Sequence, residues 1–349
     1  MLFSLSVLSV SSVVNKSMKT AVFTVDPKSP SAKAIAEAAQ VLRGGGLVAF
    51  PTETVYGLGA NALDASAVAR IFAAKGRPPN NPLIVHIAEA SEARKVVADW
   101  PQTAARLAER FWPGPLTLVL RKRDEVPDAV TAHGPTVAVR VPAHPVAQAL
   151  LRAARVPIAA PSANRSTELS PTRTEHVLRG LDGRIDVLLD GGPTAGGIES
   201  TVLDLTANPP RLLRPGLLGI AELESVVGPL AVGQAFQPDA PLPSPGMMPR
   251  HYAPRTPLEC VASDNAERVA SLSRDGRRVG WVTFTAPRVA PSGVLVRVLP
   301  DDPAGYASLL YAVLHELDAA GLDRVVVTLP PNTDDWLAVR DRLRRAASE

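Results

Sequence analysis

Two cations at the end of a helical pattern are the first residues of this sequence that could take part in a chemical step. Lys75 and Arg77 stand in the run KGRP, where a glycine and a proline form a turn. A lysine supplies a point charge and an arginine supplies a planar fork of donors, so the pair suits a polyphosphate. The simpler interpretation is that both cations interact with the dipole at the end of the helix. The spacing alone leaves both interpretations open.

Polar side chains also follow two apolar segments that we interpret as strands. Thr52 follows residues 47–50, and Ser162 and Asn164 follow residues 156–160. Hydroxyls, amides and small residues at the carboxyl ends of strands are typical of ligand sites in α/β proteins. Each segment could equally be an ordinary loop.

Several single polar residues have two explanations each. Arg140 lies between valines, where an arginine is costly to bury unless it meets a protein carboxylate or an anionic ligand. His86 lies in an apolar strand, where a hydrogen-bonded core histidine is the simpler interpretation. Ser170 precedes a predicted helix, so capping alone could explain it. Ser200 and Arg214 add a hydroxyl and a cation near later strands.

Several familiar signatures are absent from the sequence. It has no Gly-Lys-Ser/Thr phosphate loop, no metal-ligand spacing among its six histidines and no serine in a nucleophile elbow. The glycines at 44–46 follow a predicted helix and precede a predicted strand, whereas a dinucleotide-binding fingerprint follows a strand and precedes a helix. We therefore interpret these glycines as the end of the helix. The single cysteine, Cys260, excludes disulfide frameworks and cysteine-based metal sites. The chemistry that remains is positioning and charge neutralisation.

Length and composition indicate a two-domain globular protein. The chain has 349 residues, of which 46% are apolar and 20% charged. Its net charge of +3 is compatible with anionic ligands such as nucleotides or RNA without requiring them. We interpret residues 1–17 as an extension or a mis-assigned start before Met18, rather than as a targeting segment. No later run is apolar enough for a membrane span, so we expect a cytoplasmic location.

Apolar periodicity predicts an α/β fold in two units that a linker joins. In the first unit, residues 18–231, we expect helices at 31–43, 64–75, 91–100, 102–111, 146–155 and 172–181. The expected strands of this unit are a first strand directly after Met18 and then 47–50, 83–87, 116–120, 137–141, 156–160, 185–190, 201–205 and 211–213. Residues 232–257 are rich in proline and show no periodicity, which indicates a stiff linker. The elements expected in the smaller unit, residues 258–349, are strands at 258–262, 278–284, 294–299 and 323–329 and helices at 303–320 and 334–347.

The last predicted helix carries four arginines. They are Arg340, Arg342, Arg344 and Arg345. A solvated helix face is the simpler explanation, and contact with RNA or a partner is the alternative.

Taken in order, these segments resemble a known family. The strings FPTETVYGLG, KGRPPNNPLIVHI, WPGPLTLVL, TVAVRVPAHP, PIAAPSANRS, SPT, DGG, ESTV and RLLRPG are similar to the YrdC-type domain of L-threonylcarbamoyladenylate synthases, over about residues 41–216. The run SPGMMPRHYAP at 244–254, followed by a small α/β unit, resembles the long form of that family. Relatives usually carry lysines around an aromatic residue where this chain has MMPR at 247–250. The resemblance implies a YrdC-like twisted open sheet flanked by helices, plus a smaller Rossmann-like α/β domain.

The resemblance implies a nucleotidyltransferase that converts L-threonine, bicarbonate and ATP into threonylcarbamoyl-AMP and pyrophosphate. A transferase complex would then modify the adenosine beside the anticodon of tRNA, and direct contact with tRNA is a further option. Mg²⁺ would bridge phosphate oxygens of ATP, without a dedicated protein site. The residues that the family pattern implies for L-threonine are Thr52, His86, Arg140, Ala160 and Ser200.

The family pattern also implies a nucleotide site and a lid. The residues implied for ATP are Lys75, Arg77, Asn81, Thr136, Ser162, Ser170, Arg214 and Tyr252. The residues that resemble the catalytic K-x-R…S-x-N set of the family are Lys75, Arg77, Ser162 and Asn164. Tyr252 resembles a family tyrosine that folds over the nucleotide, which would make the linker a lid, whereas a plain spacer is the alternative.

Two other functions fit parts of the sequence. One is an RNA-binding module without catalysis, because the cations could grip a phosphate backbone. The other is the related carbamoyltransferase of hydrogenase maturation, whose cysteine-rich fingers this chain cannot form with one cysteine.

Overall fold

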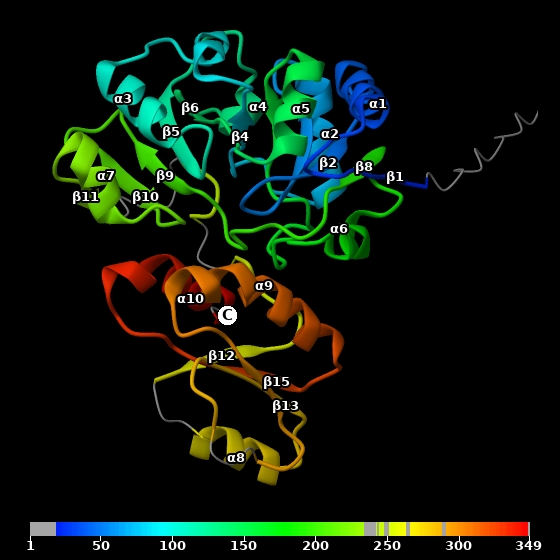
Figure 1. The fold of residues 1–349 in the computed structure, drawn as a ribbon, viewed down its shortest axis with the longest axis vertical. Helices are drawn as coiled ribbons and strands as arrows, with labels where there is room; N and C mark the ends of the chain where they lie inside the picture. The colour runs from blue at the N-terminus through cyan, green and yellow to red at the C-terminus, as the bar shows by residue number, and fades with distance from the viewer. Residues whose placement is uncertain are drawn as a thin grey trace, which may run out of the picture.

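The computed structural model describes residues 19–233, 242, 244–247, 251–262, 266–287 and 291–347. These residues form two units, each built on its own β-sheet (Figure 1). The larger unit lies above the smaller one, which is coloured yellow to red. The predicted α/β fold with a large sheet and a smaller second sheet is confirmed. Residues 1–17, interpreted above as an extension, lie outside the described residues.

The large sheet has eleven strands in the order β1-β8-β2-β3-β7-β4-β6-β5-β9-β10-β11. The strands are β1 (Ala21–Thr24), β2 (Val48–Pro51), β3 (Tyr56–Asn61), β4 (Ile84–His86), β5 (Leu116–Arg121), β6 (Thr136–Arg140), β7 (Ile158–Ala159), β8 (Val187–Asp190), β9 (Thr201–Asp204), β10 (Arg211–Arg214) and β11 (Ala231–Val232). Parallel and antiparallel pairs are mixed, and β2, for example, is parallel to β8 and antiparallel to β3. Strands distant in the chain are therefore neighbours in space.

Helices cover both faces of this sheet. They are α1 (Ala32–Arg43), α2 (Ala65–Lys75), α3 (Gln102–Phe111), α4 (Asp128–Thr131), α5 (Pro145–Ala154), α6 (Thr174–Leu181), α7 (Ile220–Val227) and the 3-10 helix η1 (Ala90–Lys95). In β2, Val48 and Phe50 pack in a core with α1 and α5, whereas Ala49 packs in the opposite core with Val68 and Ile71 of α2. Successive side chains of a strand point to opposite faces, so this apolar run needs a core on each side.

The small sheet has four parallel strands in the order β12-β15-β13-β14. Its elements are β12 (Leu258–Val261), α8 (Ala266–Arg274), β13 (Val279–Thr283), β14 (Leu295–Val298), α9 (Pro303–Ala319), β15 (Arg324–Thr328), the 3-10 helix η2 (Asp334–Trp336) and α10 (Leu337–Ala347). Figure 1 shows α9 and α10 between this sheet and the large unit, and α8 on the far side. The smaller α/β domain expected from the sequence is thus present.

One hydrophobic core joins the two units. Leu310 of α9 and Leu343 of α10 are fully buried in the same cluster as Val55, Leu169 and Ile198 of the large unit. Burial of apolar surface across the junction stabilises the association of the two units. Helices α9 and α10 therefore lie beside the loops of the large sheet.

Some predicted elements differ from the observed ones. The helix expected at 91–100 is wrong beyond Lys95, because Val97 forms a β-bridge with Lys122 and Trp100 precedes a proline, which disfavours helical geometry. The segment after β2, interpreted as a strand-to-helix loop, forms the hairpin strand β3. Elements α4, α7, β11 and α8 were not predicted. In the described part of the chain, no helix is long and apolar enough to cross a membrane.

Candidate active site

One cavity collects most of the residues that the sequence singled out. The predicted residues that line it are Thr52, Arg77, His86, Arg140, Ala160, Ser162, Ser200, Arg214 and Tyr252. The rest of its wall consists of Thr54, Val55, Gly57, Ile84, Pro161, Glu199, Pro245 and His251. Lys75, Asn164 and Ser170 do not line the cavity but hydrogen-bond to residues that do.

A tight turn between β2 and β3 positions Thr52. The backbone N–H groups of Thr54 and Val55 donate to Thr52 Oγ1 at 3.2 Å, and the Thr52 hydroxyl lies 2.7 Å from the Val55 carbonyl oxygen. Such hydroxyl-to-backbone bonds fix a turn.

Gly59, within β3, packs closely against a neighbouring strand. A Cβ on Gly59 would approach Ile158 Cγ2 to 2.8 Å. This glycine therefore permits close packing inside a strand and does not mark a loop.

Arg140, the last residue of β6, meets a protein carboxylate. Its Nη2 donates to Glu53 Oε1 at 2.6 Å, its Nη1 to Thr54 Oγ1 at 3.0 Å and its Nε to the Gly114 carbonyl oxygen at 3.1 Å. Burial raises the pKa of Glu53, but Arg140 and the hydrogen bonds lower it by more, so this carboxyl stays ionised. Of the two explanations left open for Arg140, the protein carboxylate is present. The guanidinium nevertheless lines the cavity.

His86 and Ala160 form the wall beside Arg140. His86 ends β4 and is the register partner of Arg140. Burial, followed by the charge of Arg140, lowers the pKa of His86 to about 3, so the imidazole is neutral at physiological pH. His86 is thus a buried histidine, as the simpler interpretation held, and it also faces the cavity.

Lys75 is a buried cation held by carbonyl oxygens. It ends α2, whose C-cap Gly76 has a φ of +62° in the left-handed region that favours glycine. Its Nζ donates to the carbonyl oxygens of Ser162 and Asn164 at 2.5 Å each. Burial, followed by the nearby charge of Arg77, lowers the pKa of Lys75 well below its usual value. A cation that served only the helix dipole would not need burial to 1% exposure.

Arg77 and Arg214 extend this positive region. Arg77 Nε donates to the Asn81 carbonyl oxygen at 3.0 Å, and its Nη2 donates to the Pro82 carbonyl oxygen at 2.8 Å. Arg214 ends β10 and donates from Nε to the Ser200 carbonyl oxygen and from Nη2 to Ser200 Oγ, both at 3.1 Å. Within the described ranges, neither these arginines nor the lysine above forms an ion pair with a carboxylate. Buried positive charge without a directly bonded carboxylate is costly, so this part of the cavity suits an anion.

The segments KGR and SAN, expected to act together, are in contact. Ser162 Oγ donates to Asn164 Oδ1 at 2.5 Å, and Lys75 Nζ lies 3.3 Å from the same oxygen. Asn164 Nδ2 donates to the Glu168 carbonyl oxygen at 2.7 Å. The lysine, the hydroxyl and the amide therefore form one hydrogen-bonded group.

Two further residues predicted for ATP, Asn81 and Thr136, also do not line the cavity. Asn81 is fully buried behind Arg77, and its Oδ1 accepts a bond from Arg77 Nη2 at 2.5 Å. Thr136 begins β6 and faces the same side as Ala138, because side chains alternate along a strand. Met247 of the linker packs in one cluster with Ala138. Asn81 thus contacts the cavity-lining Arg77, and Thr136 lies at the opposite end of β6 from Arg140.

Ser170 and the last helix differ from the simpler expectations. The helix that Ser170 would cap begins only at Thr174, and the Ser170 hydroxyl donates to Glu199 Oε1 at 2.5 Å instead. The expected solvated helix face is wrong for Arg342, whose side chain is 0% exposed and donates from Nε to Glu199 Oε2 at 2.7 Å. Residues of the second unit thus reach the cavity wall.

Tyr252 belongs to the wall and not to a plain spacer. It is 1% exposed, and its ring centroid lies 4.0 Å from that of His251 and 5.9 Å from that of Tyr311. Its hydroxyl has no hydrogen-bond partner among the described residues.

The cavity measures about 50 Å³, whereas sites for drug-sized ligands measure about 300–1,000 Å³. Residues 248–250, where the chain departs from the family pattern, lie outside the described residues.

Sequence reasoning missed three charged residues of the site. Glu53 was seen only as part of a polar run, and Glu199 only as a neighbour of a serine. Arg342 carried a usable signal, because it follows the buried Val339 by three positions and precedes the buried Ala346 by four. That spacing places all three on one helix face. An arginine on an apolar face predicts a buried partner.

Two family models match the chain, one on each side of residue 217. The Sua5/YciO/YrdC model, described as telomere recombination, matches residues 40–216. The model described as threonylcarbamoyl-AMP synthase, C-terminal domain, matches residues 219–348. The fold and these matches define a class, the two-domain proteins with a Sua5/YciO/YrdC-type first domain.

Individual relatives agree with both models. The threonylcarbamoyl-AMP synthase of Bacillus subtilis strain 168 is 44% identical over 346 residues, which cover 95% of this chain and 98% of that protein. The crystal structure of Pyrococcus abyssi Sua5 complexed with L-threonine has a TM-score of 0.88 at 42% identity and covers 94% of this chain and 98% of its own. Escherichia coli YciO has a TM-score of 0.54 at 28% identity and covers 58% of this chain and 99% of its own. This chain belongs to the threonylcarbamoyl-AMP synthase family.

Proposed function

We propose that this chain makes threonylcarbamoyl-AMP and pyrophosphate from L-threonine, bicarbonate and ATP. The observation that carries the proposal is the group of buried cations, Lys75, Arg77 and Arg214, which have no carboxylate partner among the described residues. A polyphosphate would supply the anions that these cations lack. Membership of the family over both units and the threonine complex of the Pyrococcus abyssi relative support the same substrates.

The reaction requires two bond-forming steps. The amino group of threonine adds to the carbon of bicarbonate and water leaves, which gives a carbamate. A carbamate oxygen then attacks the α-phosphorus of ATP, and the bond between this phosphorus and the bridging oxygen breaks, so that pyrophosphate leaves with the electron pair. Charge accumulates on phosphate oxygens in this step, and fixed cations nearby stabilise it. No covalent intermediate with the protein is needed.

At the threonine end, we assign the carboxylate of the substrate to Arg140. Its guanidinium already donates to a protein carboxylate, but each Nη carries a second N–H, so a substrate carboxylate can share it. We assign the hydroxyls of Thr52 and Ser200, two residues that line the cavity, to polar atoms of the substrate. Neutral His86 adds no positive charge beside the amine that must react. The small side chain of Ala160 leaves room for the substrate side chain.

At the reacting phosphate, we assign the catalytic set Lys75, Arg77, Ser162 and Asn164. The three N–H groups of Lys75 Nζ already face oxygen atoms. The longest of these contacts, 3.3 Å to Asn164 Oδ1, is the one that a phosphate oxygen would replace most readily. Binding of the phosphate also raises the depressed pKa of Lys75, because an anion stabilises the protonated amine.

We assign the remaining nucleotide contacts to residues around this set. Arg214 and Ser170 would bond further oxygens, and Asn81 would hold Arg77 in place. Thr136 would contact the part of the nucleotide that extends along β6. The cavity of about 50 Å³ is too small for ATP, and we propose that the linker that contributes Tyr252 moves before the nucleotide enters.

Mg²⁺ enters this scheme as part of the MgATP substrate. Among the residues that the structure describes, no group of three or more His, Cys, Asp or Glu side chains could hold a metal ion. The Glu199 carboxylate in the wall already accepts bonds from Arg342 and Ser170. We therefore assign no residue of this chain as a metal ligand, and phosphate oxygens are expected to hold the ion.

The product has a mixed anhydride that water can hydrolyse, so a second enzyme has to consume it soon after release. We propose that this consumer is a threonylcarbamoyl transferase complex that modifies tRNA beside the anticodon in the cytoplasm, and direct contact of this chain with tRNA stays a prediction. We also propose that residues 18–231 form the catalytic unit, residues 232–257 the lid and residues 258–349 the supporting domain.

Pyrophosphate release by the purified protein tests the proposal. ATP and Mg²⁺ are supplied throughout, and L-threonine and bicarbonate are omitted in turn. We expect release only when both are present, and its loss in Lys75→Met but not in Lys28→Met, which changes an exposed lysine. Folded protein that releases no pyrophosphate and binds RNA with a steep salt dependence would instead favour the RNA-binding module.

A further inference from the structure

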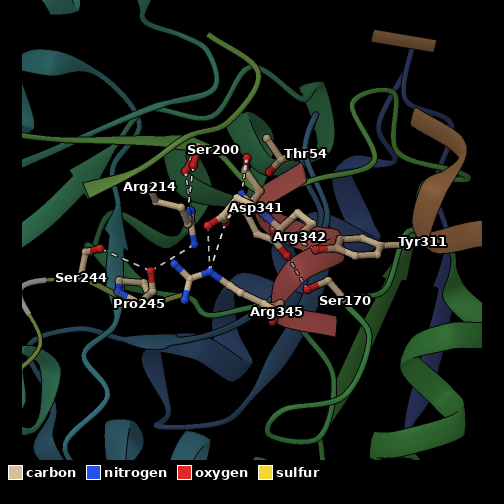
Figure 2. Close-up of polar contacts among 12 residues, drawn as sticks. Thr54, Ser170, Ser200, Arg214, Ser244, Pro245, Tyr311, Asp341, Arg342 and Arg345 are labelled. Atoms are coloured by element: carbon tan, nitrogen blue, oxygen red, sulfur yellow. Dashed lines mark hydrogen bonds and ion pairs between the residues drawn. The ribbon is translucent and has the colours of Figure 1, made fainter. Parts of the chain in front are cut away.

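The last helix of the chain sends one buried arginine into the active-site wall of the other unit. Arg342 Nε donates to Glu199 Oε2 at 2.7 Å, and its Nη1 donates to Asp341 Oδ2 at 2.8 Å. The guanidinium carbon lies 5.1 Å from the centroid of the Tyr252 ring. Figure 2 shows Arg342 beside Asp341, with Ser170 and Tyr311 close by. Arg342 therefore contacts a carboxylate and an aromatic ring that both line the cavity.

Glu199 transmits this contact to residues that we assign to the substrates. Its Oε1 accepts the Ser170 hydroxyl at 2.5 Å, and its Oε2 accepts the Tyr311 hydroxyl at 3.2 Å as well as Arg342. The next residue, Ser200, accepts bonds from Arg214 at its carbonyl oxygen and at its hydroxyl. The orientation of the Glu199 side chain thus sets where the Ser170 hydroxyl lies, and its backbone leads directly into Ser200.

We propose that Arg342 is a positioning residue of the active site, which holds the Glu199 carboxylate and, through it, keeps the Ser170 hydroxyl and the cavity-lining Ser200 in place. This inference rests on the proposed function and extends it, because it gives the second unit a direct part in arranging the nucleotide site. The Arg342 side chain is buried behind the residues that line the cavity, so its effect passes through Glu199.

The charges around Glu199 explain why one arginine has this influence. The charged and titratable groups that face Glu199 are Arg342 from α10, Arg214 from β10, Tyr311 from α9 and Tyr252 from the linker. Burial raises the pKa of Glu199, but Arg342 and then Arg214, with the Ser170 hydrogen bond, lower it by more. Removal of Arg342 takes away the larger positive charge, so the pKa of Glu199 rises. A protonated carboxyl donates a hydrogen bond, which changes how Ser170 can bond to it.

A purely structural role for Arg342 predicts a different result when this residue is replaced. An arginine that only joined the two units would lower their stability when replaced, but the folded fraction would keep the nucleotide affinity and the pH profile of the wild type. A positioning role predicts weaker ATP binding in the folded variant and a pH profile displaced toward higher pH, because the pKa of Glu199 rises when the charge of Arg342 is removed. The pH profile therefore separates the two roles.

The test compares four variants of the full chain. They are Arg342→Met, Arg342→Lys, the double variant Glu199→Gln with Arg342→Met, and the control Arg340→Met. Arg340 lies on the same helix and bonds the Pro330 carbonyl oxygen, away from the cavity. ATP affinity by calorimetry and kcat/KM for ATP are both measured from about pH 6 to pH 8.

We expect Arg342→Met to lose about tenfold or more in ATP affinity and kcat/KM relative to the wild type at the same pH, with the largest difference at the acid end. The double variant is expected to be weak at all pH values, because glutamine does not titrate, and Arg342→Lys is expected to restore part of the affinity. The control is expected to match the wild type. Wild-type affinity and an unchanged pH profile in folded Arg342→Met would overturn the inference.

The design separates this inference from the proposed function. If the wild type makes no threonylcarbamoyl-AMP, the proposed function fails, while the ATP-affinity measurements still decide the role of Arg342. If Arg342→Met does not fold, the double variant decides, because it leaves no unpaired carboxylate in the wall. A folded double variant with wild-type ATP affinity overturns the positioning role.

Discussion

Replacement of Arg140 by methionine gives the most informative perturbation of the threonine end. The side chain is 4% exposed, and its three bonds to Glu53, Thr54 and Gly114 fix the guanidinium at the end of β6. If this group also binds the carboxylate of threonine, Arg140→Met removes a hydrogen bond between charged groups. Such bonds contribute about 1.5–3 kcal/mol, which corresponds to a rise of about 10- to 150-fold in KM for threonine.

The same replacement leaves Glu53 without its cation, and this effect has to be separated from substrate binding. Loss of one partner of a fully buried pair costs about 3–5 kcal/mol of folding free energy, and the 17% exposure of the Glu53 side chain makes the cost smaller here. The double variant Glu53→Gln with Arg140→Met removes the stranded carboxylate. We expect it to regain most of the lost stability without regaining affinity for threonine.

The assay is pyrophosphate release against threonine concentration at saturating ATP and bicarbonate, with thermal unfolding of each variant as a check of the fold. Arg106→Met, which changes an exposed arginine of α3, is the matched control and is expected to keep the wild-type KM. The KM for ATP is expected to change by less than about threefold in Arg140→Met, since its guanidinium lies at the threonine end. A folded Arg140→Met variant with the wild-type KM for threonine would refute the assignment.

Three further predictions concern the fold, the junction of the units and the phosphate site. Gly59→Ala is expected to lower the free energy of unfolding in denaturant by about 1–3 kcal/mol, because its Cβ would lie 2.8 Å from a neighbouring side chain. The control Gly44→Ala is expected to be nearly neutral, because its Cβ would meet no atom closer than 3.4 Å and its φ is −83°. His176 and His315 stack across the junction with centroids 3.8 Å apart, and burial lowers their pKa values from 6.5 to about 4 and about 3. The unfolded chain therefore binds more protons between pH 6.5 and pH 4, so the free energy of unfolding should fall as pH falls through this window, and a flat profile would contradict the prediction. Burial also lowers the pKa of Lys75, so ATP binding is expected to take up protons and to weaken as pH rises, which calorimetry in buffers of different ionisation enthalpy can measure.

Local signals in the sequence predicted the helices that begin and end with clear caps. Asp64 accepts bonds from the backbone N–H groups of Ser66 and Ala67, and Gly76 ends the same helix in a left-handed conformation. Both features act within a few residues of the chain, which is why sequence alone reveals them. The arginine and lysine of the KGR turn were likewise recognised as cations that could meet a phosphate.

The remaining parts of the site depend on contacts between distant segments. Glu199 and Arg342 are 143 positions apart, and no local pattern pairs them. Gly59 of β3 looked like a loop residue, because its packing against Ile158 becomes visible only when the strands are paired. The pairing of β2 with both β3 and β8 is also non-local. Such pairings follow from the whole chain and not from short windows.

The most direct test of the proposed reaction is the mass of the nucleotide product formed with ¹³C-labelled bicarbonate, L-threonine and MgATP. We expect a product with the mass of threonylcarbamoyl-AMP that carries one ¹³C atom, formed together with pyrophosphate. Formation of unlabelled AMP or ADP alone, in a preparation shown to be folded, would contradict the proposed function.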